Sequence, residues 1–109
     1  MSDADDPFGP ESVRFVWDEP KNRANIAKHG IDFADAYHAF KHDMLVLSDN
    51  REDYGEQQWI GLGFLDGRLV VIIFTEPRSD TIRIISLRKA TRHERDRFRR
   101  TIENQLGQG

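Results

Sequence analysis

The 109-residue sequence contains no cysteine, which excludes disulfide bonds, thiolate catalysis and cysteine-based metal sites. It also lacks any apolar run near the ~20 residues that a membrane-spanning helix needs. The acidic N-terminus, MSDADDPFGPE, has neither the basic nor the apolar region of a secretory signal. We therefore expect one small cytoplasmic domain with a modest hydrophobic core.

The common cofactor and catalytic motifs are absent as well. There is no phosphate-binding loop, no dinucleotide glycine fingerprint and no serine elbow. Of the four histidines, His38 and His42 are four residues apart, but no carboxylate accompanies them at metal-ligand spacing. We expect both at the exposed end of a helix, and we expect neither a metal nor another cofactor.

Positive charge is concentrated in one segment, although the formal net charge is −3. Eight of the 16 Lys and Arg residues lie between Arg83 and Arg100, against two acidic residues, in IRIISLRKATRHERDRFRR. One interpretation is a solvated helix face. The other is a continuous positive surface that follows a phosphate backbone, with Arg92, Arg95 and Arg99 along one side of the helix. We favour the polyanion-binding surface.

Alternating apolar residues predict five strands, over residues 13–17, 44–49, 58–65, 68–75 and 81–87. The fourth strand, RLVVIIFT, is apolar on both faces, which is typical of a central strand. We expect a flexible acidic arm over residues 1–12, a single domain over residues 13–106 and a frayed end over residues 107–109.

Capping signals place three helices around these strands. Asp18 precedes Glu19-Pro20, and Gly30 suits a left-handed C-cap. Asp32 opens a second helix that reaches residue 40, and Thr91-x-x-Glu94 is a capping box that opens the last one. The predicted fold class is α+β, a small antiparallel sheet packed with two N-terminal helices and a C-terminal helix.

The Asp66-Gly67 turn predicts that Leu65 faces Arg68 in a hairpin. If the next loop pairs residue 75 with residue 81, Arg88 lies opposite Arg68, and a phosphate between them would relieve the repulsion. The alternative is that the two arginines splay into solvent or pair with Asp66 and Glu94. We expect the two Cα atoms within about 7 Å if the clamp exists.

Three further residues have competing explanations. Alternation places Arg83 on an apolar face, where it must find a carboxylate, reach an edge or hold a ligand, and the ion pair is favoured. His29 is either a general base or a partner of the helix dipole, and the dipole role is favoured. Gly61 and Gly63 alternate in a strand, which suggests close packing against a bulky side chain such as Trp17 or Trp59.

Three segments together resemble the BrnT-type ribonuclease toxins: FVWDEPKNRANIAKHGIDFADA, DYGEQQWIGLG and IRIISLRKATRHERDRF. The resemblance covers most of the chain and implies a RelE-like fold. It implies RNA cleavage without a metal and neutralisation by a BrnA-like antitoxin. That antitoxin would carry a DNA-binding domain, and the complex would repress its own operon.

The resemblance also implies site residues. The basic site falls on Arg68, Arg83, Arg88 and Lys89, with Lys28, His29 and Glu94 as weaker candidates. Three positions depart from the family pattern. Phe98 stands where tyrosine is common, Leu87 where a smaller residue is common, and Gln57-Gln58 where a basic residue is frequent.

Metal-free RNA cleavage needs a base for the 2′-hydroxyl, charge stabilisation of the phosphorane and an acid for the leaving oxygen. The arginines suit the second task, and the proton-transfer candidates are His29, Glu94 and Lys89. Two other classes of function use the same basic surface. One is a non-catalytic nucleic-acid-binding or adaptor module, and the other is a structural partner whose C-terminal helix binds an acidic protein.

Overall fold

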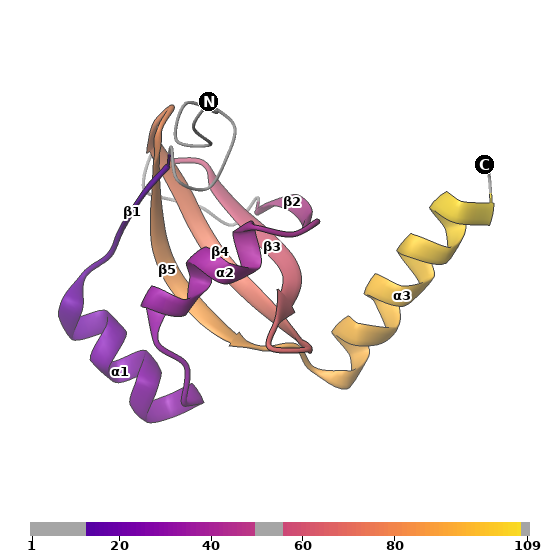
Figure 1. Ribbon diagram of the computed structural model, residues 1–109, viewed down its shortest axis with the longest axis horizontal. Coiled ribbons are helices and arrows are strands. Elements are labelled where there is room, and N and C mark those ends of the chain that lie inside the picture. The colour runs from indigo at the N-terminus through magenta and orange to yellow at the C-terminus, as the bar shows by residue number, and fades with distance from the viewer. Residues whose placement is uncertain (1–12, 50–55, 108–109) are drawn as a thin grey trace, which may run out of the picture.

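A computed structural model describes residues 13–49 and 56–107 as one five-stranded sheet with helices on both of its faces. Figure 1 shows α1 and α2 beside the sheet and α3 projecting away from it. The elements are β1 (Arg14–Val16), α1 (Glu19–His29), the 3₁₀ turn η3 (Phe33–Asp35), α2 (Ala36–Phe40), β2 (Leu45–Asp49), β3 (Gln58–Leu65), β4 (Arg68–Arg78), β5 (Thr81–Lys89) and α3 (Arg92–Gly107).

The sheet has the order β1-β5-β4-β3-β2, so β4 is central, as its two apolar faces predict. Four strands are antiparallel to their neighbours, but β1 runs parallel to β5, with Phe15 opposite Ile82. The prediction of a purely antiparallel sheet is therefore wrong, and the sheet is mixed. Alternation within a short strand marks its buried face but carries no information about the direction of its neighbour.

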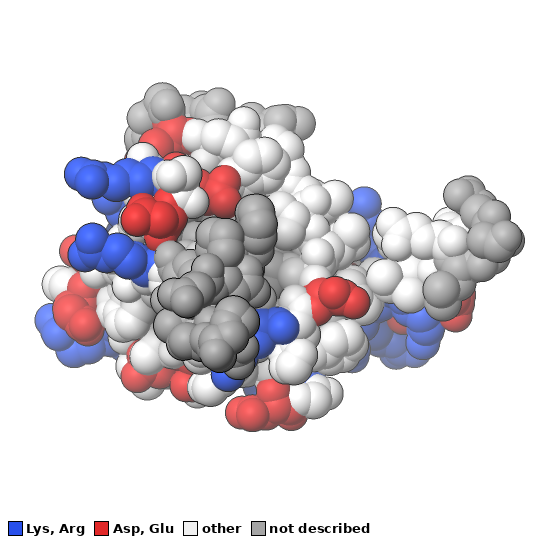
Figure 2. All heavy atoms as spheres, turned by 45° about the horizontal axis from the view of Figure 1, so that its top comes forward, with Lys and Arg blue, Asp and Glu red and all other residues white. Residues whose placement is uncertain are grey.

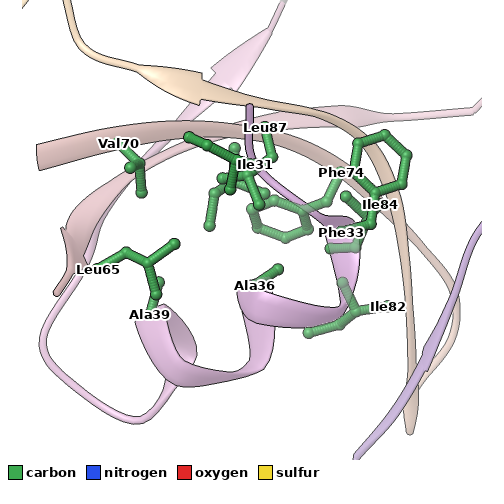
Figure 3. Packing of buried hydrophobic residues seen from close by; sticks show 11 residues of the cluster. Ile31, Phe33, Ala36, Ala39, Leu65, Val70, Phe74, Ile82, Ile84 and Leu87 are labelled. Atoms are coloured by element: carbon green, nitrogen blue, oxygen red, sulfur yellow. The ribbon is translucent and has the colours of Figure 1, made fainter. Parts of the chain in front are cut away.

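The larger part of the core lies on the face covered by η3 and α2, which we call the helix-covered face. Figure 3 shows Ala36 and Ala39 of α2 facing the sheet. Small side chains let this short helix approach the strands closely, and large apolar side chains fill the remaining space. The buried residues of this cluster are Ile31, Phe33, Ala36, Ala39, Leu65, Val70, Ile72, Phe74, Ile82, Ile84 and Leu87.

The opposite face, which we call the α3 face, holds a smaller cluster. Leu62, Leu69, Val71 and Ala90 are buried there, and Phe98 of α3 packs against them. Odd-numbered residues of β4 therefore face α3, and even-numbered ones such as Val70 face α2.

The predicted caps are confirmed. The Asp18 carboxylate accepts a hydrogen bond from the Lys21 backbone N–H at 3.1 Å, and Gly30 ends α1 with φ of 73°. In the capping box, the Thr91 N–H donates to Glu94 Oε1 at 2.8 Å and the Glu94 N–H donates to Thr91 Oγ1 at 3.1 Å. The second predicted helix is shorter than expected because the turn after Asp32 is the 3₁₀ turn η3.

Two buried asparagines of α1 fix that helix to the rest of the molecule. The Asn25 side-chain amide donates to the carbonyl oxygens of Ile31 at 2.9 Å and Leu87 at 2.8 Å, and its oxygen accepts the Leu87 N–H at 3.3 Å. Asn22 accepts the Phe33 N–H at 2.8 Å. Because β1 pairs with β5 only as far as Arg83, Asn25 supplies the backbone partners that a neighbouring strand would supply at Leu87.

The first hairpin has the predicted register, with Leu65 opposite Arg68. The second hairpin does not, because β4 continues to Arg78 and Thr75 lies opposite Arg83 instead of Thr81. The register shifts twice, between residues 73 and 74 and between residues 75 and 78. Pro77 lies within the second shift, where its missing N–H interrupts the ladder without ending the strand.

Several smaller predictions have mixed outcomes. A Cβ built on Gly61 would lie 2.6 Å from Met44 Sδ, so the close neighbour is Met44 and not a tryptophan. Gly107, the first residue of the predicted frayed end, is the last residue of α3. The rest of that end, residues 108–109, lies outside the described residues, and so do the predicted arm at residues 1–12 and most of the loop before β3. Across the described ranges, no helix is long and apolar enough to cross a membrane.

Candidate nucleic-acid interface

A groove of about 480 Å³ lies between the β3–β4 hairpin, the end of β5 and α3. We call it the basic groove, because four cationic side chains line it and one acidic residue, Glu103, joins them. Those cations are Arg68, Lys89, Arg95 and Arg99. Its remaining lining is mainly apolar and comes from Phe64, Gly67, Leu69, Ala90, Phe98 and Ile102.

The position of α3 creates this groove. Phe98 inserts toward the α3 face of the sheet, and its ring lies 5.7 Å from that of Phe64 in an edge-on arrangement at 79°. Arg95 donates through Nη1 to the Ala90 carbonyl oxygen at 3.1 Å. Arg95 and Arg99 are four residues apart, so they share one side of the helix and extend the line of positive charge away from the sheet.

An ion pair holds the first turn of α3 to the sheet. Arg88 Nη1 and Nη2 donate to the two carboxylate oxygens of Glu94 at 2.9 and 2.8 Å. This pairing lowers the pKa of Glu94 to about 2, mainly through the Arg88 hydrogen bond. The same bond raises the pKa of Arg88 above its usual value. Glu94 is therefore ionised and held by two partners, which makes it a weak base.

The predicted clamp between Arg68 and Arg88 is wrong. Arg88 lies opposite Val71, whereas Arg68 lies opposite Leu65. Arg68 and Arg88 are therefore not cross-strand partners, because the register shifts in β4 move Arg88 three positions from its expected partner.

Arg83 lies apart from the basic groove. Its predicted ion pair is confirmed, since Nη1 lies 3.3 Å from Glu56 Oε2, but the prediction of an apolar surrounding is wrong because its side chain is 46% exposed. It lines a second cavity, of about 380 Å³, with Arg14 and Arg78. Sequence reasoning missed these two neighbours, because only the parallel pairing of β1 with β5 brings Arg14 to this place.

The other predicted site residues are dispersed. Lys28 is exposed and His29 is half-buried in the last turn of α1, and neither belongs to the lining of the basic groove. Arg92 is exposed at the start of α3, outside that lining. His38 and His42 are exposed, as predicted. Among the residues that the structure places, no group of three or more His, Cys, Asp and Glu residues is arranged to hold a metal ion.

Ion pairs within the chain engage part of the positive charge between Arg83 and Arg100. Figure 2 shows basic side chains in separate groups, at one edge of the body and under the projecting helix, with acidic side chains among them. Three of the cations in this segment pair within the chain: Arg83 with Glu56, Arg88 with Glu94 and Arg99 with Asp96. The basic groove brings four of the ten predicted site residues around one cavity: Arg68, Lys89, Arg95 and Arg99.

Comparison with known proteins identifies the family to which the chain belongs. The family model described as the ribonuclease toxin, BrnT, of type II toxin-antitoxin systems matches residues 17–94. The chain belongs to the BrnT family of ribonuclease toxins. The match includes Arg68, Arg83, Arg88 and Lys89, whereas Arg95 and Arg99 lie beyond its end.

A solved structure extends the comparison to three dimensions. The chain is similar to the Brucella abortus ribonuclease toxin BrnT, with 30% sequence identity and a TM-score of 0.57. The similar region covers 73% of this chain and 99% of the Brucella chain. None of the curated proteins compared with the chain matches it. The chain therefore shares the fold of this BrnT structure.

Proposed function

We propose that this BrnT-family toxin is a cytoplasmic endoribonuclease that cleaves RNA by metal-independent phosphodiester transfer. The match of residues 17–94 to a family of ribonuclease toxins carries the proposal. The reaction needs a base for the 2′-hydroxyl, cations for the phosphorane and an acid for the 5′-oxygen. The four cations of the basic groove and the paired arginines outside it supply the second requirement.

Arg68 and Lys89 are the groove cations that come from the sheet, and they approach from adjacent antiparallel strands. A phosphate between them gains charge-assisted hydrogen bonds from a rigid support. Arg95 and Arg99 then contact the neighbouring phosphates of the strand. Arg88 is engaged by Glu94, so an RNA phosphate reaches its guanidinium only in competition with that carboxylate.

Of the proton-transfer candidates, Lys89 lines the basic groove, whereas His29 lies outside its lining in the last turn of α1. Glu94 is the poorest of the three predicted groups, because a carboxylate with a pKa of about 2 accepts a proton weakly at neutral pH. Phe98 carries no ionisable group and forms part of the groove wall. With a weak base, positioning and charge stabilisation provide most of the rate enhancement.

The direct test is cleavage of RNA by the purified toxin in EDTA. Lys89→Ala should lower cleavage at least tenfold, whereas Arg23→Ala, which removes the same charge from an exposed site on α1, should change it little. Binding of uncleaved RNA should weaken with salt at a log–log slope near −0.7 for each phosphate contacted. Cleavage that stops in EDTA would contradict the metal-independent mechanism.

Toxicity in cells tests the site residues further. Arg83→Ala, Arg88→Ala and Lys89→Ala should each reduce growth arrest on expression, provided that circular dichroism shows matched folding. Full toxicity of a folded Arg83/Arg88 double variant would remove both arginines from the site. RNA binding without cleavage by the wild type would favour the non-catalytic adaptor function.

The partner part of the proposal is a BrnA-like antitoxin with a DNA-binding domain. Membership of a type II toxin-antitoxin family implies a protein antitoxin. The toxin alone should not shift operator DNA in a gel, whereas the complex should shift it and repress the operon. Operator binding by the toxin alone would contradict this division of tasks.

A further inference from the structure

The basic groove has an apolar interior that RNA cleavage does not require. Phe64, Leu69 and Phe98 line it, and Phe64 is 45% exposed. The apolar surface continues past Phe98, which also lines two smaller cavities of about 210 and 340 Å³. In the view of Figure 2, few charged side chains cover the surface between the body and α3. A contiguous apolar surface rimmed by polar groups is typical of a protein interaction site.

The backbone around the groove limits the form of its occupant. Leu69 pairs with Phe64 of β3, and its carbonyl oxygen accepts the Ala90 N–H at 2.9 Å. Lys89 pairs with Val70. Leu69 belongs to the central strand β4, which has a neighbouring strand on each side, so a strand added across the groove could not pair with it. A helix needs no such partners, because it binds through side chains on one face.

The charge around the groove defines the occupant further. Four cations and one carboxylate line it, and Arg95 and Arg99 follow one side of α3. A helix with acidic residues along one edge complements this rim and steers association. Its apolar residues at positions i, i+3, i+4 and i+7 would fill the interior against Phe64 and Phe98.

We infer that the basic groove receives an acidic amphipathic helix of the cognate antitoxin. The inference rests on the proposed function, because it assumes that the antitoxin silences the toxin by covering cations that otherwise hold RNA. The helix lies between the β3–β4 hairpin and α3, with its apolar face toward Phe64, Phe98 and Ile102 and its acidic edge toward Arg95 and Arg99.

A second copy of the chain suits the groove poorly. Among the described helices, α3 is itself basic, α2 has five residues, and α1 carries Glu19 as its single acidic residue. RNA covers the apolar part of the basic groove less completely than a protein helix does, because a base stacked on Phe64 leaves the apolar surface beyond Phe98 uncovered. Both occupants give distinct results in the experiment below.

The experiment measures antitoxin affinity by calorimetry on the full-length toxin with two variants from opposite walls of the groove. Ile102→Glu places an acid among the groove cations, and Phe64→Ser removes an exposed ring. Each has a matched control outside the groove lining. Asn104→Glu adds the same charge to an exposed position of α3, and Val46→Ser removes an apolar side chain that is also 45% exposed.

Ile102→Glu and Phe64→Ser should each weaken antitoxin binding at least tenfold, and the controls should change it less than threefold. RNA binding and cleavage by the free variants are measured in parallel, because Phe64 and Ile102 line the same groove as the cations proposed to hold RNA. Antitoxin affinity equal to that of the wild type in both folded variants would overturn the inference. Loss of RNA binding with intact antitoxin affinity would assign the groove to RNA, and dissociation of a toxin dimer would assign it to a second copy.

The two proposals fail in different ways. If the wild type does not cleave RNA but Ile102→Glu still weakens the antitoxin complex, the groove inference stands and the ribonuclease mechanism falls. If the wild type cleaves RNA and the antitoxin neutralises every groove variant as well as the wild type, the groove inference falls and the ribonuclease mechanism stands.

Discussion

The ion pair between Arg88 and Glu94 gives the most direct quantitative prediction, because it ties α3 to the sheet. Arg88→Met and Glu94→Gln keep the side-chain stems and remove the charges. Two hydrogen bonds of 2.9 and 2.8 Å join side chains that are 32% and 30% exposed. Exposed pairs contribute up to about 1 kcal/mol, and partly buried bidentate pairs contribute more. We expect a coupling free energy of about 1–2 kcal/mol in a double-mutant cycle.

The pKa of Glu94 gives a scale for this value. A fall from the ordinary 4.5 to about 2 corresponds to a net ~3 kcal/mol, in which desolvation offsets part of what the bonds to Arg88 and Thr91 contribute. Partial exposure screens the charges and lowers the share that belongs to Arg88. The side-chain oxygen of glutamine still accepts the Thr91 N–H, so the cycle separates the ion pair from the helix cap.

The assay is urea unfolding of the wild type, both single variants and the double variant at neutral pH. The exposed pair between Arg99 and Asp96, whose arginine side chain is 67% exposed, provides the control. Its cycle, Arg99→Met with Asp96→Asn, should give a coupling below about 0.5 kcal/mol. A coupling at Arg88 and Glu94 no larger than that of the control would refute the claim that this pair anchors α3.

Three further predictions follow from the structure. The pKa of Glu94 is lower in the folded state than in the unfolded state, so its contribution to the free energy of unfolding is complete above pH 4.5 and is lost as the pH falls toward 2. In acid titrations, the stability difference between wild type and Glu94→Gln should therefore shrink over that range. Asn25→Ala should lower the unfolding free energy by about 3 kcal/mol and speed hydrogen exchange at the Leu87 amide, because buried backbone groups lose their partners. Gly61→Ala should lower the free energy of unfolding in urea by about 1–2 kcal/mol, because the added Cβ would meet Met44. A variant as stable as the wild type would show that the Met44 side chain moves aside freely.

Signals within a few residues of one another predicted the local structure well. The Asp18 cap, the Gly30 terminus, the Asp66-Gly67 hairpin and the capping box before α3 are all found. Each depends on the chemistry of one turn, which the sequence carries completely. The two apolar faces of β4 likewise identified the central strand, because burial on both sides leaves a direct mark on composition.

Relations between distant segments were predicted less well. The shifts around Phe74 and Pro77 change the partner of every later residue in β5, and nothing in the alternation of β5 marks them. The prediction for Arg83 was right about an ion pair and wrong about burial, since its partner Glu56 is 27 residues away. Sequence showed where cations are concentrated but not which of them the fold neutralises.

Some cations of the basic segment pair within the chain and others line the basic groove, and Arg99 does both. The Arg88–Glu94 pair lies at the end of the family match and fixes the base of α3. The groove then combines Arg68 and Lys89 from the matched region with Arg95 and Arg99 from beyond it. An inhibitor that binds both walls would contact side chains from the sheet and from α3 while it covers the cations that we propose for RNA binding. Selectivity for one antitoxin and a shared ribonuclease activity need not use the same residues, even when they share one groove.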